Sequence, residues 1–305
     1  FLTHAISGLW PAMLMPVTRD GTLDTPRAIA HAKHLMEAGC DGVTIFGTTG
    51  EGPAFSSAER MGLLDTMLAD GIAPGQIIVT TSTCALPEAI ALGRHASSKG
   101  CHKQLYMPPF YFRQPRDAGV VDAVSQVVHG IDDKKLQMLL YHIPALSSVA
   151  FSNESITELV KRHPEQVIGV KDSSGDRAFG LALAKAFPGL SILIGAEQYV
   201  AETMRAGGSG SINGLANISP RLLRRIIDAP GQVQAYDEKL VLDLLALLSV
   251  LPDMPFVNVY KTMLAGQTGD DAWLHVRAPL CPLTKDEAQT VRRAYRAIGK
   301  MLEQV

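Results

Sequence analysis

Eight short apolar segments alternate along the chain with longer stretches of helical periodicity. Each segment is rich in β-branched or leucine residues and is flanked by glycine, proline or polar residues, as expected for parallel strands buried on both faces. Between the segments, apolar residues recur at the spacing of one buried helix face, as at Ala30, Leu35 and Met36. The apolar segments cover residues 10–17, 42–47, 77–82, 103–109, 137–144, 167–172, 191–195 and 208–213.

Helix start signals occur at the expected places between these segments. Thr25 precedes Pro26, which predicts a capping residue followed by proline at the first helical position. Capping boxes begin at Ser56 and Thr284, each with a glutamate three residues later. Eight strand–helix units predict an α/β fold, the (β/α)₈ TIM barrel. A doubly wound sheet is disfavoured because no GxGxxG turn follows the first segment.

The strand signals stop near residue 228. Three helical stretches follow, at about 232–250, 254–266 and 284–304. We therefore expect a barrel over residues 1–228 that carries the active site, and a C-terminal three-helix region over residues 229–305.

Composition excludes several functional classes. The 305 residues are 47% hydrophobic, and 28 basic residues face 30 acidic ones, so the chain lacks the basic excess of a nucleic-acid binder. No apolar run is long enough to span a membrane, and the first residues do not resemble a signal peptide. The four cysteines form no CxxC pair and no zinc-ligand spacing, so we expect buried, reduced thiols in a cytoplasmic protein without metal or other cofactor.

Reactive groups of a TIM barrel lie at the carboxyl ends of its strands. The second segment ends in GTTGE at residues 47–51, whose glycines and hydroxyls suit a small carboxylate or phosphate, although an ordinary turn is the competing interpretation. The fifth ends at Tyr141, whose phenol could relay protons or could be a rim tyrosine with a satisfied hydroxyl. Pleat alternation turns the neighbouring His142 to the opposite face, so we expect a structural role for it.

The sixth segment, residues 167–172, is the most informative. Alternation places Lys171 on the same face as Gly169, which leaves space beneath the lysine if that face points inward. An amine withdrawn from water is a nucleophile that can form a Schiff base with a carbonyl. The alternative is a rim lysine paired with a carboxylate such as Asp172. Together, the anion cradle, the phenol and the amine suit imine chemistry on a 2-keto acid.

Five ordered motifs resemble those of the dihydrodipicolinate synthase / N-acetylneuraminate lyase family. They are GTTGE at 47–51, PFY at 109–111, YHIP at 141–144, GVKD at 169–172 and GSING at 210–214. The resemblance covers nearly the whole chain. It implies a class I pyruvate-dependent lyase that needs no cofactor, with a (β/α)₈ barrel, additional C-terminal helices and usually a homotetrameric assembly.

The resemblance also implies residue roles. Lys171 would form the imine with pyruvate or with the 2-keto end of a substrate, and Tyr141 would donate and accept protons. Thr48 would link Tyr141 to Tyr111 in a proton relay, with Tyr111 reaching in from a neighbouring subunit. Thr49 would bind the pyruvate carboxylate through its hydroxyl and its N–H group.

Substrate choice departs from the family patterns. Ile212 would offer a backbone contact to pyruvate, as in the family, but Leu146 stands where the synthases carry an arginine for the second substrate's carboxylate. Gly195 and Glu197 lie where sialic acid lyases bind a polyol tail with two acidic residues, and Gln198 replaces the second of these. These departures favour an aldolase or dehydratase acting on 2-keto-3-deoxy sugar acids.

Other functions stay open at this stage. Dihydrodipicolinate synthase and N-acetylneuraminate lyase are the alternatives within the family. A non-catalytic barrel that binds a keto acid is the alternative outside it, although a degenerate site should have lost at least one of Lys171, Tyr141 and Thr48. A metal-dependent sugar isomerase would need clustered acidic or histidine ligands, and Asp172 and Glu51 are too few. The expected partners are a small 2-keto acid and further copies of the chain, with no nucleic acid and no membrane.

Overall fold

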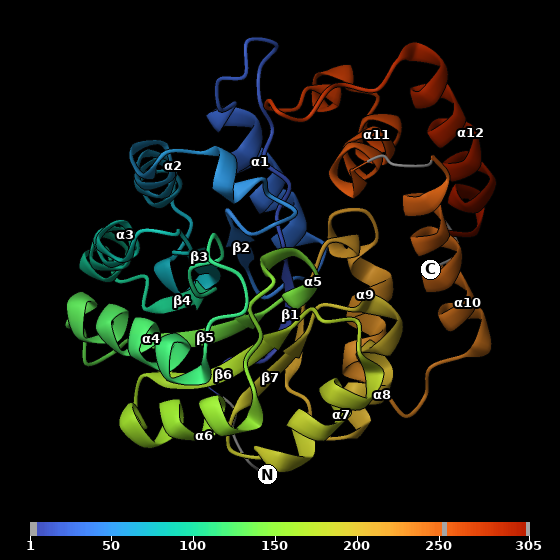
Figure 1. Ribbon diagram of the computed structural model, residues 1–305. Coiled ribbons are helices and arrows are strands. Elements are labelled where there is room, and N and C mark those ends of the chain that lie inside the picture. The colour runs from blue at the N-terminus through green and yellow to red at the C-terminus, as the bar shows by residue number, and fades with distance from the viewer. Residues whose placement is uncertain (1–4, 252–254, 303–305) are drawn as a thin grey trace.

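The (β/α)₈ barrel is present in the computed structural model, which describes residues 5–251 and 255–302 (Figure 1). All eight strands run parallel and pair in the order β1-β8-β7-β6-β5-β4-β3-β2. A bridge between Ala12 and Thr44 joins β1 to β2 and closes the ring. The strands are β1 (Gly8–Pro11), β2 (Val43–Ile45), β3 (Ile77–Thr80), β4 (Lys103–Tyr106), β5 (Gln137–His142), β6 (Val167–Asp172), β7 (Ser191–Ile194) and β8 (Gly210–Asn213).

The first strand differs from its prediction at both ends, because the apolar segment at 10–17 is only partly a strand. β1 begins at Gly8 and ends at Pro11. Beyond it, the N–H of Leu14 donates to the side-chain oxygen of Asn217 at 3.0 Å instead of to a strand backbone. Residues 12–17 stay apolar because the loop they form is buried over the barrel end.

Helices surround the strands on the outside of the barrel (Figure 1). Each strand is followed by at least one helix, as the repeat of strand and helix patterns predicted. These helices are α1 (Thr25–Glu37), α2 (Ser57–Ala69), α3 (Leu86–Ser98), α4 (Asp117–Ile131), the short α5 (Pro144–Ser147), α6 (Asn153–Arg162), α7 (Arg177–Ala186), α8 (Val200–Arg205) and α9 (Pro220–Asp228).

Two of the predicted helix starts are confirmed and one is wrong. The boxes at Ser56 and Thr284 form, with each residue bonding reciprocally to the glutamate three positions later. The cap of α1 is Asp24 and not Thr25, because the Asp24 carboxylate accepts from the N–H of Arg27 while Thr25 already belongs to the helix.

Strand alternation separates an inner and an outer apolar layer. Trp10, Ile78, Leu105, Leu139 and Leu193 belong to one buried cluster, with one residue from each of five strands. Their neighbours on the same strands belong to the clusters beneath the helices. This two-sided burial is the reason that the strands read as continuous apolar segments.

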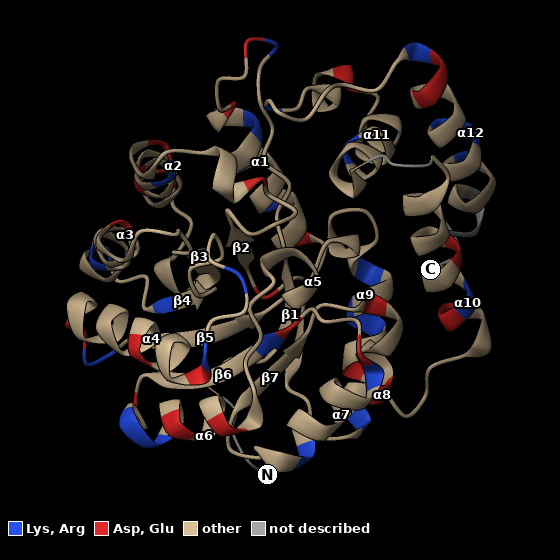
Figure 2. Ribbon diagram, viewed as in Figure 1, with Lys and Arg blue, Asp and Glu red and all other residues tan. Residues whose placement is uncertain are grey.

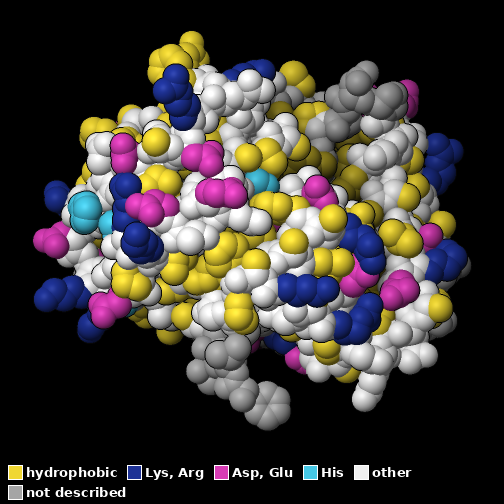
Figure 3. All heavy atoms as spheres, turned by 60° about the horizontal axis from the view of Figure 1, so that its bottom comes forward, with side chains coloured by type: hydrophobic (Ala, Val, Ile, Leu, Met, Phe, Trp, Pro, Cys, Tyr) yellow, Lys and Arg dark blue, Asp and Glu magenta, His cyan; other side chains and the backbone are white. Residues whose placement is uncertain are grey.

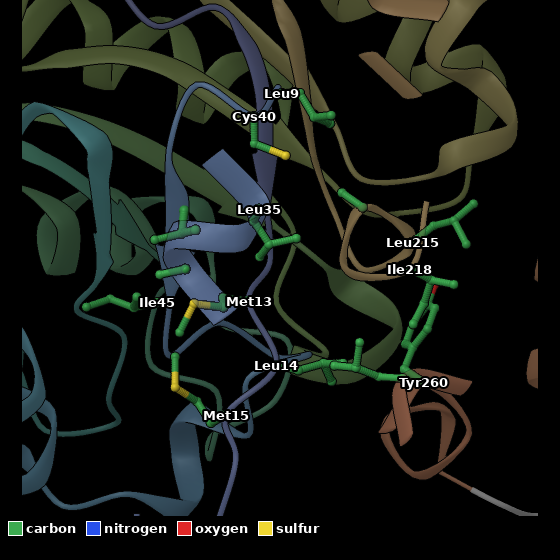
Figure 4. Close-up of a cluster of buried hydrophobic side chains, with 14 of the residues drawn as sticks. Leu9, Met13, Leu14, Met15, Leu35, Cys40, Ile45, Leu215, Ile218 and Tyr260 are labelled. Carbon is green, nitrogen blue, oxygen red and sulfur yellow. The ribbon is translucent and has the colours of Figure 1, made fainter. Parts of the chain in front are cut away.

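After α9 the chain forms α10 (Ala235–Ala246), α11 (Phe256–Thr268) and α12 (Lys285–Leu302). α10 and α12 lie within the predicted stretches at 232–250 and 284–304, whereas α11 runs two residues past the end of the predicted stretch 254–266. Residues 254, 303 and 304 of these stretches are outside the described part. α11 is buried in the same cluster as the strands and loops of the barrel. Figure 4 shows Tyr260 of α11 near Leu14 and Ile218, so the C-terminal helices reach the barrel end where the strands finish.

Charged residues of both signs are distributed over the outer helices and loops (Figure 2). The face in Figure 3 likewise mixes apolar, basic and acidic groups. No helix in the described part combines the length and apolarity that crossing a bilayer requires. The cysteine prediction is only half right: Cys40 and Cys101 are buried, but Cys84 and Cys281 are exposed because each lies in a loop at the surface.

Candidate active site

A cavity of about 180 Å³ opens at the carboxyl ends of the strands. Its lining brings together residues from six strand ends and from the C-terminal helices. They are Ala12, Thr48, Thr49, Tyr141, Ile143, Leu146, Lys171, Ser173, Gly195, Glu197, Ile212, Asn213, Gly214, Leu248, Phe256 and Tyr260. Every predicted site residue except Tyr111 is among them.

Lys171 points into this cavity from β6, as alternation predicted. Its side chain is only 3% exposed, and Nζ lies 4.0 Å from the centre of the Tyr141 ring. No carboxylate in the described part of the chain lies within 4.0 Å of this amine. Asp172, the alternative partner, faces the other way: its carboxylate accepts from the N–H of Ser174 at 2.9 Å, and burial raises its pKa. The amine is therefore available to a ligand.

Tyr141 and Thr48 form a hydrogen bond in the cavity that Lys171 enters. The phenol oxygen and the Thr48 hydroxyl are 2.9 Å apart, so one donates a hydrogen bond to the other. The two residues lie 93 positions apart in the chain and come from the ends of β5 and β2. A proton on the phenol thus has a hydroxyl neighbour through which it can be exchanged.

The turn that carries Thr48 and Thr49 is tight because glycines flank the two threonines. A Cβ on Gly50 would lie 2.6 Å from the carbonyl oxygen of Met13, so no larger residue fits there. The N–H of Glu51 donates to the carbonyl of Thr48 at 3.0 Å and closes the turn. Thr49 is buried and lines the cavity beside Thr48, where its hydroxyl and N–H can face an anion.

His142 lies on the outer face of β5, as predicted. Its Nδ1 accepts from the N–H of Phe151 at 3.0 Å, and its ring stacks on Phe179 with centres 4.5 Å apart. Burial lowers its pKa to about 4, so the imidazole is neutral at physiological pH. It is a structural residue and has no contact with the cavity.

Glu197 enters the cavity wall from the turn after β7. One carboxylate oxygen accepts from the N–H groups of Gly214 and Leu215, at 3.2 and 3.0 Å, and from the Tyr260 hydroxyl at 3.4 Å. Burial raises the pKa of Glu197, and burial together with the Glu197 charge raises that of Tyr260. Gln198, beside Glu197 in the sequence, is exposed and does not line the cavity.

The remaining predicted substrate contacts lie at two depths. Ile212 is fully buried on β8, and Gly195 lies so close to Ser173 that a Cβ would be 2.1 Å from its hydroxyl. Leu146 is at the mouth and 61% exposed. No basic side chain other than Lys171 lines the cavity in the described part of the chain.

Tyr111 is not brought to the cavity of its own protomer. Its side chain is 76% exposed and packs edge-on against Phe112, with ring centres 5.3 Å apart. Two adjacent exposed aromatic rings on a loop after β4 are an uncommon surface feature, because such rings are usually at least partly buried. Its assignment to a neighbouring subunit's site stays a prediction.

Sequence reasoning missed several lining residues. Ser173 and Asn213 follow or end predicted strands, and their position at a barrel rim could have identified them. Leu248, Phe256 and Tyr260 come from the C-terminal helical region and form an apolar wall over the cavity. No local pattern distinguishes them from other core residues of those helices.

Comparison with known proteins resolves the family. The sequence model described as "Dihydrodipicolinate synthetase family" matches residues 5–298. The chain belongs to this family. A curated relative from Chloroflexus aurantiacus, described as an uncharacterized DapA-like lyase, is 33% identical, with 95% of this chain and 96% of the relative covered.

Solved structures agree with this assignment to the dihydrodipicolinate synthase family. The crystal structure of dihydrodipicolinate synthase from Agrobacterium tumefaciens is 34% identical and superimposes with a TM-score of 0.88, covering 96% of this chain and 99% of that chain. A variant of the 2-keto-3-deoxygluconate aldolase of Sulfolobus solfataricus, 18% identical over 97% of this chain and 98% of its own, shares the fold with a TM-score of 0.86. The protein is a lyase of the dihydrodipicolinate synthase family.

Proposed function

We propose that Lys171 is the imine-forming residue of an aldolase or dehydratase that acts on 2-keto-3-deoxy sugar acids. The observation that carries the proposal is the buried Lys171 amine, which has no carboxylate partner and lies against the Tyr141 ring in a cavity with two threonine hydroxyls. An amine in such a site attacks a ketone, loses water and forms an imine.

The cavity residues account for each step of a cleavage. Thr49 and the backbone of Ile212 hold the carboxylate end beside Lys171. Tyr141 takes the proton of the C4 hydroxyl as the C3–C4 bond breaks, and the electron pair of that bond moves into the imine to give an enamine. An aldehyde leaves, Tyr141 returns a proton to C3, and water releases pyruvate from Lys171. As Tyr141 takes the C4 proton, its own phenolic proton leaves through the hydrogen-bonded Thr48 hydroxyl, and it returns by the same route when Tyr141 protonates C3.

The outer cavity supports a neutral second half of the substrate. Ile143, Leu146, Leu248 and Phe256 form its apolar side, and among the described residues that line it no cation could pair with a second carboxylate. The polar side carries Ser173, Asn213 and Glu197, which suit the hydroxyls of a sugar tail. Dihydrodipicolinate synthesis is less well supported, because its second substrate brings a carboxylate to Leu146.

Assembly and location complete the proposal. Exposed Tyr111 and Phe112 support a homotetramer in which Tyr111 completes the relay of another subunit. Four free cysteines support a cytoplasmic location, where thiols stay reduced. Residues 1–228 carry the reacting groups, and residues 229–305 supply the apolar wall.

Borohydride trapping tests the central assignment. The protein is incubated with pyruvate, reduced, digested and mapped by mass spectrometry, and the adduct is expected on Lys171. The Lys171→Arg variant should give no adduct, whereas Tyr141→Phe should retain some because its phenol is not the nucleophile. An adduct on another lysine contradicts the proposal. A panel of 2-keto-3-deoxy acids, each assayed for pyruvate release and for dehydration, then identifies the substrate.

A further inference from the structure

We propose that Lys261 and Glu51 are positioning residues, a buried ion pair through which helix α11 holds the Thr48 hydroxyl against Tyr141. The inference rests on the proposed function, because it concerns the proton relay of that reaction. Neither residue lines the cavity. The pair reaches the reacting groups through the turn that carries Thr48.

The ion pair is fully withdrawn from water. Lys261 is 0% exposed, and its Nζ donates to one carboxylate oxygen of Glu51 at 2.5 Å and to the carbonyl of His275 at 3.0 Å. The two partners are 210 residues apart in the chain. A buried ion pair is commonly no more stabilising than apolar residues of the same volume, so stability alone is a weak reason for this one.

The second oxygen of Glu51 is also held. It accepts from the N–H of Arg277 at 3.2 Å. The Arg277 guanidinium in turn donates to the carbonyl oxygens of Gly21 and Ala54 and pairs with Glu59. The segment after α11 therefore contacts the turn at Glu51 and at Ala54. Both oxygens of the Glu51 carboxylate accept hydrogen bonds from fixed donors.

Glu51 lies three residues after Thr48, so a constraint on Glu51 also restricts the backbone of Thr48. Its backbone has a φ of 54°, a left-handed conformation that a glutamate adopts only when its surroundings hold it. Its N–H donates to the Thr48 carbonyl at 3.0 Å, and the next N–H, of Gly52, donates to the Gly47 carbonyl at 3.0 Å. A Cβ on Gly52 would lie 1.8 Å from the Phe46 carbonyl, so the backbone of the turn packs directly against the residue that follows β2. When the Glu51 carboxylate is released, the strained backbone can revert and carry Thr48 away from Tyr141.

A double-mutant cycle separates positioning from general stability. The readout is the exchange of the C3 protons of pyruvate in D₂O, followed by NMR at saturating pyruvate. Lys261→Met and Thr48→Val should each slow exchange about 10- to 100-fold, since misplacing a reacting group by about 1 Å costs on the order of 100-fold. In the Lys261→Met background, Thr48→Val should cause little further loss, because the hydroxyl is already out of place.

Two further variants secure the test. Glu51→Gln retains one acceptor oxygen for Lys261 and removes the charge, so it serves in the same cycle if Lys261→Met does not fold. Arg225→Gln is the matched control: it breaks the ion pair of Arg225 with the buried Asp237, between α9 and α10 and away from the turn. Because the two sites are independent, the fold-change that Arg225→Gln causes in the exchange rate should multiply with the fold-change caused by Thr48→Val.

The outcomes are distinguishable. Non-additive losses for Lys261 or Glu51 with Thr48, beside multiplicative losses for Arg225, support the inference. Multiplicative losses throughout overturn it and leave the proposed function intact, provided that wild-type protein forms the Lys171 adduct. If the wild type forms no adduct on Lys171, the proposed function is wrong and the positioning inference falls with it.

Discussion

Gly169 lies two residues before Lys171 on β6. Replacing Gly169 with alanine should displace Lys171 and slow imine formation. The Cβ of an alanine would lie 2.1 Å from the carbonyl oxygen of Ser191 and 2.8 Å from both the Ser191 Cβ and a Leu139 methyl. Gly169 and Ser191 are register partners between β6 and β7. The methyl group therefore meets a neighbouring strand backbone, which cannot rotate out of the way.

The size of the effect follows from the contact distance. Ordinary contact begins at 3.4 Å, so the Ser191 oxygen and the new Cβ must separate by about 1.3 Å. Overpacking of a core costs roughly 1–3 kcal/mol, and a clash with backbone belongs at the upper end, about 3 kcal/mol. For a chain of this length the loss corresponds to a fall in Tm of roughly 5 °C. A shift of about 1 Å at Lys171 should also slow imine formation on the order of 100-fold.

Calorimetry and the rate of pyruvate adduct formation measure the two effects. The matched control is Gly62→Ala, in an exposed position of α2 where an added Cβ has nothing within 4 Å; it should raise stability by up to about 1 kcal/mol and leave the adduct rate unchanged. A Gly169→Ala protein whose Tm and adduct rate match those of the wild type would show that the spacing of β6 and β7 does not position Lys171, and would refute the reasoning.

Three other predictions concern the cavity mouth, acid stability and assembly. Leu146→Arg should raise kcat/KM for aspartate semialdehyde condensation about 10- to 100-fold, the value of a charge-assisted hydrogen bond; no gain would show that another group already binds that carboxylate. Burial lowers the pKa of His31 to about 4 from 6.5, so only the unfolded chain gains a proton there between those values and stability falls as pH falls. His31→Gln should therefore lose about 1 kcal/mol less than wild type between pH 6 and 5 in denaturant titrations. Light scattering at micromolar protein should report a dimer or a tetramer, and a fully active monomer would contradict the placement of Tyr111 in a neighbouring site.

The local pattern of the chain was enough to predict the barrel and the orientation of its central residues. Strands that are buried on both faces appear in the sequence as continuous apolar segments. The two-residue period of a strand separates the side chains of one face from those of the other. Alternation therefore put Lys171 on the same face as Gly169 and turned His142 away from Tyr141, and the structure shows that Lys171 and Tyr141 are on the inward faces. The same reasoning failed for residues 12–17, because a loop buried over the barrel end is as apolar as a strand.

Only the tertiary structure decided which distant residues complete the site. Leu248, Phe256 and Tyr260 look like ordinary core positions of C-terminal helices, and nothing in their spacing says that they face Lys171. The Lys261–Glu51 pair joins residues from opposite ends of the chain, and a charged residue in a helix reads as exposed until its surroundings are known. Periodicity reports whether a side chain is buried, since burial shapes every helix and strand, but it carries no information on which side chain lies opposite. That partner is chosen by the packing of whole elements against one another.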